Sequence, residues 1–430
     1  MAQVLKFIDL FAGIGGIRKG FELACAAEGF KCECVFTSEI KDSAITVLQQ
    51  NHPEDIIVGD ITKVRESDIP DFDYLLAGFP CQAFSAAGKR MGFEDTRGTL
   101  FFDVARILKE KKPKGFVLEN VEGLVNHDRQ NPKDTIGRTL STILNTLDEL
   151  GYHVSWKVLN AKDFGVPQDR KRIYIVGSKK GLPDLSGFVN KSASLEDILE
   201  YGLPVSDHPF VKNLLKHYSV DELTGKAIKD KRGGDDNIHS WDLEMKGPVS
   251  VRQKKLLSRM MTERRKKKWA LEYGIDWMDG MPLTIDMIRS FWGDDPQLEE
   301  MLDDLANKKY VVKEHPKRKL SNGQREQDES LPLGYNIVAG KMSFEVSKVL
   351  DPKGIAPTLV AMDMQHLYVP DGEGIRKLSL REGLRVFGYP DDFIMRVKQS
   401  DGYDLLGNTV VVPVIKEVAT RLLKTCEKEM

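Results

Sequence analysis

The fold is decided by the sequence LKFIDLFAGIGG at residues 5–16. Residues 5–11 predict a buried β-strand, and the glycine-rich turn after them leads into a helix predicted over residues 16–25. Further strands are predicted at 34–38, 56–58, 74–79, 115–118, 154–159 and 172–177, and a further helix at 100–111. Repeated βα units predict an α/β fold with a doubly wound, mostly parallel sheet, in which ligands bind outside the carboxyl ends of the strands.

The composition predicts a soluble globular enzyme. Of the 430 residues, 41% are hydrophobic and 30% are charged, and the formal net charge is −2. A chain of this length predicts either one large domain with an insertion or two domains. We expect a cytoplasmic protein, because no apolar run is long enough to cross a membrane and no signal peptide precedes the first strand.

The cysteines predict reduced thiols rather than disulfides or a metal site. The chain has five of them, an odd number, at positions 25, 32, 34, 81 and 426. Cys32 and Cys34 are separated by one residue, which is too close for the usual zinc spacing, so we expect no metal.

The alternation of strands and helices stops after Gly177 and an apolar helix returns only at residues 414–423. We therefore expect residues 1–182, completed by 401–430, to form the main domain, and residues 183–400 to form a second, smaller and irregular domain. Within the second domain, residues 251–269 hold nine basic residues and one acid, Glu263. This run is either a solvated helix face, as most charge runs are, or a surface that contacts phosphates.

Two acidic residues follow predicted strands near the glycine turn. Glu39 ends the second strand, where it could accept ribose hydroxyl groups, and Asp60 ends the third, where it could accept an adenine amino group. The turn lacks the full dinucleotide fingerprint, so a mononucleoside cofactor such as S-adenosylmethionine fits better than NAD. Alternatively, each acid is an ordinary helix N-cap, although that interpretation explains both acids and the glycines together poorly.

A thiol and a carboxyl group follow two other predicted strands. Cys81 lies in Pro80-Cys81-Gln82, and Glu119 begins Glu119-Asn120-Val121. A thiolate beside a proton donor can attack an electron-poor ring carbon, and the small, polar stretch 82–92 predicts a mobile loop over such a site. The alternatives are that Cys81 is a small apolar filler and Glu119 a surface acid.

A basic segment, QDRKR, occupies residues 168–172. Strand alternation would place Gln168, Arg170 and Arg172 on one face, as donors for a phosphate and a base carbonyl. The alternative is a basic edge strand without a ligand.

These motifs, in this order, resemble those of the cytosine-C5 DNA methyltransferases, mainly those of bacterial restriction–modification systems. The resemblance rests on DLFAGIGG (9–16), GFPCQAFS (78–85), TRGTLF (96–101), ENV (119–121), QDRKR (168–172), REGLRVFGYP (381–390) and GNTV (407–410). It covers about 180 N-terminal and about 80 C-terminal residues, and the stretch between them corresponds to the family's variable target-recognition domain. Gly383 stands where the family more often has cysteine, and Thr409 where it has serine or alanine.

The resemblance implies that a cytosine is flipped out of duplex DNA, that Cys81 adds to C6, and that a methyl group from S-adenosylmethionine is transferred to C5. Glu119 would bond to N3 and the exocyclic amine, Arg172 to O2, and Arg170 to a phosphate or Glu119. The implied catalytic residues are Cys81, Gln82, Glu119, Arg170 and Arg172. The implied cofactor residues are Phe11, Ala12, Gly13, Gly15, Gly16, Glu39, Ile40, Asp60, Ile61, Pro80, Leu100, Asn408 and Val410. The expected DNA contacts are Ser85, Arg97, Gln168, Arg264, Arg265 and Lys266.

The resemblance also implies double-stranded DNA as the partner and a cognate restriction endonuclease in a bacterial host. We expect a monomer with no obligate protein partner and no membrane attachment, which associates with the nucleoid when it binds DNA.

Three other interpretations fit the sequence less well. A tRNA cytosine-C5 methyltransferase shares the catalytic core, but its subgroup has a Cys-Phe-Thr element, and this chain has no cysteine between Cys81 and Cys426. A non-catalytic DNA-binding or scaffold protein would not need Cys81, Glu119 and Arg172 together. An NAD-dependent oxidoreductase would need the missing dinucleotide fingerprint.

Overall fold

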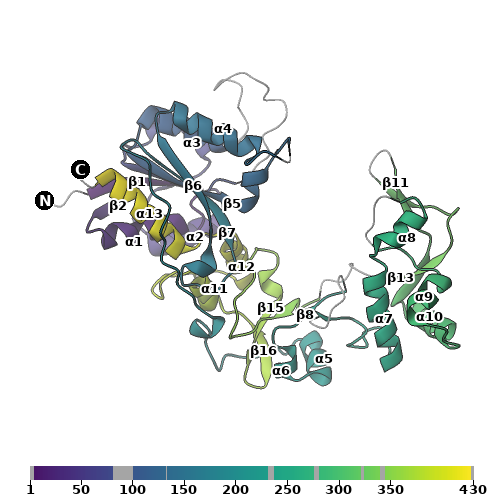
Figure 1. Cartoon of the computed structure of the whole chain (residues 1–430). Helices are drawn as coiled ribbons and strands as arrows, with labels where there is room; N and C mark the ends of the chain where they lie inside the picture. The colour runs from purple at the N-terminus through teal and green to yellow at the C-terminus, as the bar shows by residue number, and fades with distance from the viewer. Residues whose placement is uncertain are drawn as a thin grey trace. The chain divides into compact units, whose positions relative to one another are not determined.

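The computed structural model describes residues 4–80, 100–131, 133–230, 237–275, 280–320, 324–338 and 344–427. The chain divides into two compact units (Figure 1). The first contains Met1–Glu200, Pro352–Gln365 and Leu378–Met430, and the second contains Tyr201–Asp351 and His366–Lys377. We expected the division at residues 182 and 401, so the first unit is larger than predicted.

Backbone hydrogen bonds explain why the first unit extends beyond residue 182. The N–H groups of Leu195 and Glu196 donate to the carbonyl oxygens of Gly354 and Pro352 at 2.9 and 2.7 Å. Further along, the Glu200 N–H donates to the Glu382 carboxylate at 2.7 Å. These contacts attach residues 195–200 to two later segments of the first unit, which begin at Pro352 and at Leu378.

A seven-stranded sheet forms the centre of the first unit, in the order β3-β2-β1-β4-β5-β7-β6. The strands from β3 to β5 are parallel, and β7 is antiparallel to both β5 and β6. The predicted doubly wound, mostly parallel sheet is therefore confirmed. Its strands are β1 (Val4–Leu10), β2 (Lys31–Ser38), β3 (Ile57–Val58), β4 (Tyr74–Ala77), β5 (Gly115–Val121), β6 (His153–Asn160) and β7 (Lys171–Ser178).

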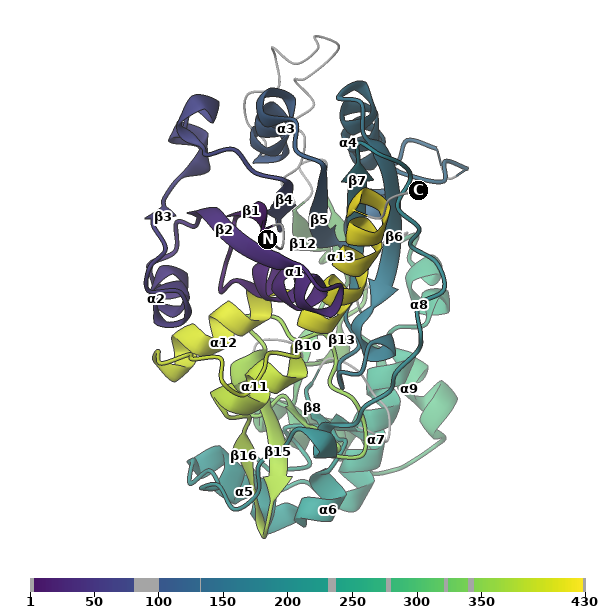
Figure 2. The same ribbon diagram turned by 90° about the vertical axis from the view of Figure 1, so that its left-hand side faces the viewer.

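Helices cover both faces of this sheet (Figures 1 and 2). The larger ones are α1 (Gly16–Ala27), α2 (Asp42–Asn51), α3 (Leu100–Lys111), α4 (Arg138–Glu149), α11 (Leu380–Val386), α12 (Gln399–Asn408) and α13 (Val412–Glu427). On one face, α3 and α4 bury side chains such as Phe101, Leu108 and Ile143 against strand residues that include Ile8 and Leu118. Burial of these apolar side chains is the main source of the unit's stability.

The opposite face of the sheet is covered by α1 together with α13, which comes from the C-terminal end of the chain (Figure 1). The ring of Phe21 in α1 lies 5.0 Å from that of Phe7 and 5.3 Å from that of Tyr74, both in the sheet. The C-terminal helix thus belongs to the first unit.

Strand direction brings the predicted site residues to one edge of the sheet. The parallel strands β1, β2, β4 and β5 end at this edge, and the antiparallel strand β7 begins there. Residues that follow β1, β2 and β4, the last residues of β5 and the first residues of β7 therefore meet.

The second unit consists of short elements around two hydrophobic clusters. One cluster includes Trp241, Leu256 and Tyr310, and the other includes Val211, Ile228 and Tyr368. The helices are α5 (Pro209–His217), α6 (Val220–Leu223), α7 (Val251–Glu263), α8 (Lys267–Glu272), α9 (Ile285–Trp292) and α10 (Leu298–Asn307). The strands are β8 (Ala227–Ile228), β9 (Asn237–Ile238), β10 (Val311–Glu314), β11 (Lys317–Lys319), β12 (Arg325–Gln327), β13 (Gly334–Ile337), β14 (Lys348–Val349), β15 (Leu367–Asp371) and β16 (Gly374–Lys377).

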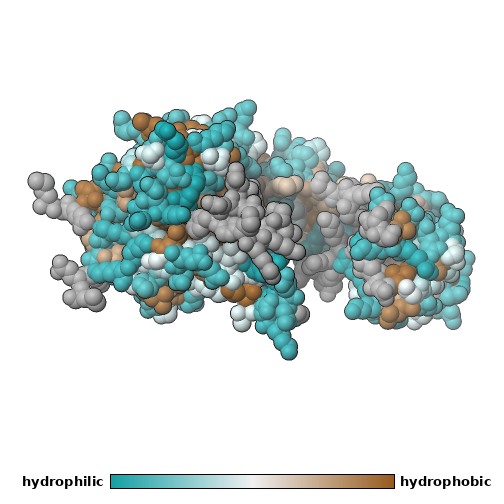
Figure 3. Space-filling view, turned by 90° about the horizontal axis from the view of Figure 1, so that it is seen from above, coloured by the Kyte–Doolittle hydropathy of each residue, from teal (hydrophilic) through white to brown (hydrophobic). Residues whose placement is uncertain are grey.

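The surface visible in Figure 3 is mostly hydrophilic, with hydrophobic residues in small separate spots. Single exposed hydrophobic residues of this kind are normal on protein surfaces. Within the described parts of the chain, no helix has the length and apolar character needed to cross a membrane.

Candidate active site

A pocket of about 330 Å³ lies at the carboxyl edge of the sheet. It brings together the predicted residues Phe11, Gly13, Glu39, Pro80, Glu119, Arg170, Arg172 and Asn408. The remaining lining residues are Lys41, Ala44, Gly78, Phe79, Asn120, Val121, Leu405, Gly407 and Thr409. Eight of the sixteen predicted catalytic and cofactor residues in the described chain thus line one cavity, although they come from distant parts of the sequence.

The charged centre of the pocket is a pair formed by Glu119 and Arg172. The distance from Arg172 Nε to Glu119 Oε1 is 3.2 Å, and the two side chains are only 14% and 11% exposed. Glu119 lies in β5 directly opposite Tyr174 of β7, and Arg172 occupies the diagonal position two residues away. Long side chains reach each other across such a diagonal.

Burial raises the pKa of the Glu119 carboxyl group above its ordinary value, and the positive charges of Arg172 and Arg170 oppose that rise. Desolvation disfavours the carboxylate, while the neighbouring guanidinium groups favour it. A carboxyl group in such a balance can hold a proton nearer to neutral pH and donate it to a bound molecule.

Arg170 holds the walls of the pocket together. Its guanidinium group donates to the carbonyl oxygens of Leu359, Gly407 and Thr409 at 2.7, 3.2 and 2.9 Å. Burial lowers its pKa to about 10, and the nearby positive charge of Arg172 acts in the same direction. The two terminal nitrogens of the guanidinium group therefore already donate to backbone carbonyl oxygens. This geometry does not support the predicted contact with a phosphate.

Asn120 fixes the end of the strand that precedes the predicted nucleophile. Its Nδ2 donates to the Phe79 carbonyl oxygen at 2.8 Å, and its Oδ1 accepts the Val121 N–H at 2.8 Å. Pro80, which comes next in sequence and precedes Cys81, lines the pocket. The predicted residues Cys81, Gln82, Ser85 and Arg97 lie outside the described residues.

Glu39 joins the end of β2 to the glycine turn after β1. Its Oε2 accepts the Gly13 N–H at 2.7 Å, and its Oε1 accepts the N–H groups of Ile40 and Lys41, each at 2.8 Å. A carboxylate has about four lone-pair positions, so three such bonds leave capacity for one more donor. Glu39 therefore both shapes the pocket and remains able to accept a hydroxyl group from a ligand.

Gly16 is required by the packing of the C-terminal segment. A Cβ atom at this position would lie 2.6 Å from the Tyr389 hydroxyl, 2.8 Å from Val410 Cγ2 and 2.9 Å from Thr409 Oγ1. Gly15 caps α1 in a left-handed conformation, with φ at 79°, which glycine adopts without strain. Both glycines, like Ala12 and Val410, lie outside the pocket lining. Their contacts with a cofactor stay predictions.

The remaining cofactor predictions also lie away from the pocket lining. Asp60 caps the short helix Ile61–Lys63, since its Oδ1 accepts the Thr62 N–H at 3.0 Å and the Thr62 hydroxyl at 2.7 Å. These bonds lower its pKa. Ile61 is buried, Ile40 is exposed, and Leu100 begins α3. The contacts of these residues with adenine remain predictions.

Two predicted DNA contacts are buried, and their side chains have structural partners. Gln168 Nε2 donates to the Val386 carbonyl oxygen at 3.5 Å, and its Oε1 accepts the Leu359 N–H at 3.2 Å. Arg264 Nη1 donates to the Ile337 carbonyl oxygen at 3.1 Å inside the second unit. Both side chains are buried in this structure, and their direct contact with DNA stays a prediction.

Within the described structure, four of the nine basic residues in the run at 251–269 form ion pairs with acids: Arg252, Lys254, Arg259 and Lys266. Arg265 and Lys266 are exposed in the turn between α7 and α8, and Lys266 pairs with Glu263 at 2.7 Å. Arg252 likewise pairs with Asp295 at 2.6 Å. Of the two interpretations of this run, paired side chains favour a structural and solvated helix face.

Two further features of the first unit were not predicted from the sequence. Lys41 lines the pocket and forms an ion pair with Asp404 of α12. Asp9 of β1 is fully buried, and neither of its carboxyl oxygens has a hydrogen-bond partner within the described structure. Burial raises the pKa of Asp9 to about 8, although the positive charge of Arg18 opposes the rise.

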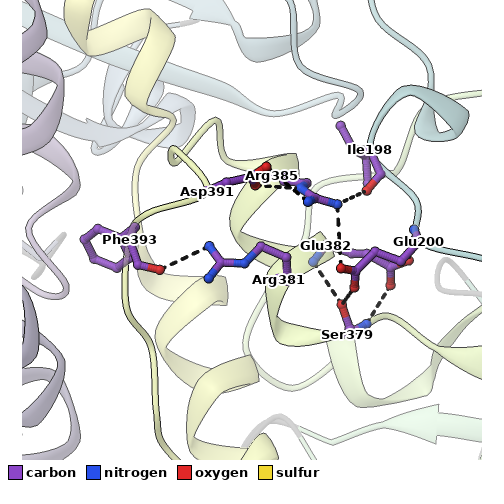
Figure 4. A network of polar contacts seen from close by, with 8 residues as sticks. All are labelled: Ile198, Glu200, Ser379, Arg381, Glu382, Arg385, Asp391 and Phe393. Atoms are coloured by element: carbon purple, nitrogen blue, oxygen red, sulfur yellow. Dashed lines mark hydrogen bonds and ion pairs between the residues drawn. The ribbon is translucent and has the colours of Figure 1, made fainter. Parts of the chain in front are cut away.

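The sequence REGLRVFGYP forms a polar network around α11 (Figure 4). Arg381 Nη1 donates to the Phe393 carbonyl oxygen at 3.1 Å. Arg385 donates to both oxygens of Asp391 at 2.8 and 3.1 Å, and to the Ile198 carbonyl oxygen at 3.3 Å. This motif thus fixes the chain around the pocket and lies outside its lining.

The sheet order, the buried acid–guanidinium pair and the cofactor-sized pocket define a class of methyltransferase, and comparison with known proteins identifies the family. The model of the family described as C-5 cytosine-specific DNA methylase matches residues 5–424, so the chain belongs to that family. The resemblance found in the sequence is confirmed.

Individual relatives agree with this assignment. Type II methyltransferase M.NlaIV of Neisseria lactamica is 64% identical over 423 residues, which cover 98% of this chain and 100% of that protein. Type II methyltransferase M.BanI of Aneurinibacillus aneurinilyticus is 39% identical over an aligned length of 458 residues, and the alignment covers 99% of this chain and 97% of that protein. A crystal structure of S. pombe Dnmt2 methyltransferase has a TM-score of 0.52 at 14% identity, covers 99% of this chain and 100% of that chain, and shows similarity of fold.

Proposed function

We propose that the protein transfers a methyl group from S-adenosylmethionine to C5 of a cytosine in double-stranded DNA, as the modification enzyme of a type II restriction–modification system. The observation that carries this proposal is the Glu119–Arg172 pair inside a pocket that also contains Glu39 and Asn408. Family membership and the names of the relatives support the chemistry.

The described pocket fits the cofactor. Its volume of about 330 Å³ is within the range of small-molecule sites, and it combines the aromatic ring of Phe11 with the acceptor Glu39 and the amide of Asn408. Glu39 would accept a ribose hydroxyl, Phe11 would contact the sulfonium, and Asn408 would close the methionine side. When bound, S-adenosylmethionine supplies an electrophilic methyl group for C5 of the activated ring.

The chain's own residues activate the cytosine. The thiolate of Cys81 forms a bond to C6 while Glu119 donates a hydrogen bond to N3, and the negative charge that develops makes C5 nucleophilic. Arg172 orients Glu119 and holds the base oxygen O2. Once C5 has gained its methyl group and S-adenosylhomocysteine remains, a solvent water takes the C5 proton. The electrons of the C5–H bond restore the C5–C6 double bond, and the C6–S bond breaks to release the Cys81 thiolate.

The second unit is proposed to read the DNA sequence. Flipping the cytosine costs a few kcal/mol, which contacts of the protein with the flipped base and the surrounding duplex must offset. We also propose a monomer in a bacterial cytoplasm, with a cognate restriction endonuclease in the same host. Exchange of residues 201–351 for those of a relative with another specificity should transfer that specificity, whereas specificity that stays with the first unit would refute this assignment.

Methyl transfer can be tested directly by bisulfite sequencing of DNA from a host that expresses the chain. We expect methylated cytosines within one short sequence motif and none in a host with the Cys81→Ser variant. That variant should still bind duplex DNA, and only the unchanged protein should be trapped covalently by DNA that contains 5-fluorocytosine. Transfer to tRNA but not to duplex DNA would contradict the proposed substrate.

A further inference from the structure

The pocket is built from two parts of the chain that are far apart in sequence. Glu39 and Lys41, just before α2, form one side, and Leu405 to Thr409, at the end of α12, form another. Ligand affinity depends on the spacing of such walls, because a wall that moves must be ordered again when the ligand binds.

Two side-chain amides at the end of α2 form hydrogen bonds with the backbone of residues 394–396, the segment that precedes α12. Gln50 Nε2 donates to the Arg396 carbonyl oxygen at 3.0 Å, and its Oε1 accepts the Arg396 N–H at 2.8 Å. Asn51 Nδ2 donates to the Ile394 carbonyl oxygen at 2.7 Å, and its Oδ1 accepts the Ile394 N–H at 2.9 Å. Each amide therefore satisfies both backbone groups of one residue, much as a neighbouring β-strand would.

The segment held by these amides leads to the pocket. Phe393, next to Ile394, packs its ring 4.5 Å from that of Tyr389, whose hydroxyl lies 2.7 Å from Thr409 Oγ1. Thr409 lines the pocket. The same residue, Phe393, is also held by α11, because its carbonyl oxygen accepts a hydrogen bond from Arg381 (Figure 4).

The beginning of α2 is also attached to the C-terminal part of the first unit, at α12. Lys41, which precedes the helix, pairs with Asp404, and the Asp404 carbonyl oxygen accepts a hydrogen bond from Asn408 Nδ2 at 2.8 Å. The Lys41–Asp404 pair is about 40% exposed, so water screens it, and a pair of this kind contributes little. The four amide bonds at the other end of α2 therefore provide most of the attachment.

We propose that Gln50 and Asn51 are positioning residues for the methyl-donor cofactor, an inference that rests on the proposed function. They bind neither cofactor nor DNA. They fix the segment of residues 394–396 to α2, and through it they set the distance between the Glu39 side and the Asn408 side of the pocket. Their loss weakens binding of the adenosyl ligand and leaves the chemical step intact once the ligand is bound.

The test compares four variants of the full-length protein with the unchanged protein: Gln50→Ala, Asn51→Ala, the double variant, and Gln49→Ala as the control. Gln49 is an exposed amide on the same helix. Affinity for S-adenosylhomocysteine is measured by calorimetry without DNA, and KM for S-adenosylmethionine and kcat are measured with duplex DNA. We expect the double variant to raise both the Kd and the KM by about tenfold, with kcat changed less than about twofold and Gln49→Ala unchanged.

A second control separates positioning from general loss of stability. Asn213→Ala removes a comparable amide-to-carbonyl bond, from Asn213 Nδ2 to the Leu243 oxygen at 3.2 Å, within the second unit. It should lower the Tm without changing the Kd for S-adenosylhomocysteine. If the double variant does not fold, the single variants Gln50→Ala and Asn51→Ala, which each keep two of the four bonds, should each give a smaller rise in Kd.

The outcomes distinguish the two proposals. Unchanged Kd and KM in the Gln50 and Asn51 variants would overturn the positioning role and leave the proposed function standing. A lower kcat at unchanged KM would do the same. An unchanged protein that binds neither S-adenosylhomocysteine nor S-adenosylmethionine would instead overturn the proposed function, and the positioning role with it.

Discussion

Glu119 and Arg172 lie on neighbouring antiparallel strands, with Glu119 Oε1 3.2 Å from Arg172 Nε. The carboxyl group is buried enough for its pKa to rise, and the guanidinium group is close enough to limit that rise. This balance suits a proton donor that must also bind a neutral base, because a fully charged buried acid would repel developing negative charge.

The Glu119→Gln variant should lower the rate of methyl transfer by about 100-fold or more, the usual contribution of a positioned acid–base group. The amide keeps the shape of the side chain but has no proton to release to N3. Transfer of labelled methyl groups to duplex DNA measures the rate. An exposed acid on α4, Glu149, gives the matched control Glu149→Gln, which should leave the rate unchanged. A normal rate for Glu119→Gln would remove Glu119 from the mechanism.

Replacing Arg172 by methionine should move the alkaline limit of activity to higher pH. Arg172 favours the charged form of Glu119, so its removal raises the Glu119 pKa further. The protonated fraction falls as the pH rises through the pKa, and a higher pKa therefore keeps the donor active to a higher pH. The pH profile of the remaining activity is the measurement, and a limit that stays in place or moves to lower pH would contradict the pairing.

The Asp9→Asn variant should change how stability depends on pH. The folded-state pKa of Asp9 is raised from 3.8 to about 8, so its contribution is fully present below about pH 4 and is lost as the pH rises through about 8. Relative to the variant, the unchanged protein should lose up to about 1.4 kcal/mol of unfolding free energy per pH unit in that interval. Urea unfolding between pH 4 and 8 measures the two slopes. The control variant Asp71→Asn changes a side chain that is 99% exposed, and its unfolding free energy should depend on pH with the same slope as that of the unchanged protein.

The Gly16→Ala variant should lower the unfolding free energy by about 1–3 kcal/mol, because its methyl group overlaps the Tyr389 hydroxyl. Gly59→Ala is the matched control, since a Cβ atom there meets nothing within 4 Å among the described atoms. Chemical unfolding of the two variants would compare them. Equal stability would show that the C-terminal segment can move away from the glycine turn without cost.

The fold could largely be predicted because its signals are local. The apolar run at residues 5–11, the helix at residues 100–111 and the closing strands near 154–159 and 172–177 all occur close to the expected positions. Four helices of the main unit, α2, α4, α11 and α12, were not predicted. In α2 only Ala44, Val47 and Leu48 are buried, so its apolar pattern is weak.

The partners of the charged residues could not be predicted in the same way. Arg264 belongs to a basic run that suggests a surface, yet the carbonyl group that accepts its hydrogen bond belongs to Ile337, on another strand. Gln168 and Leu359 are likewise separated by 191 positions in sequence. Whether a polar side chain faces solvent or the interior is decided by such distant partners, which a local pattern does not contain.

The position of α12 and α13 in the first unit has a consequence for synthesis of the protein. Because Leu405, Gly407, Asn408 and Thr409 line the pocket and α13 packs on α1, the ribosome must have made α12 and α13 before the cavity can close. A nascent chain that has emerged only as far as the second unit holds the first β-strands without their last covering helix. The pocket of a newly made chain therefore forms only after α12 and α13 have emerged, and a nick in the second unit would leave two fragments that must associate to rebuild it.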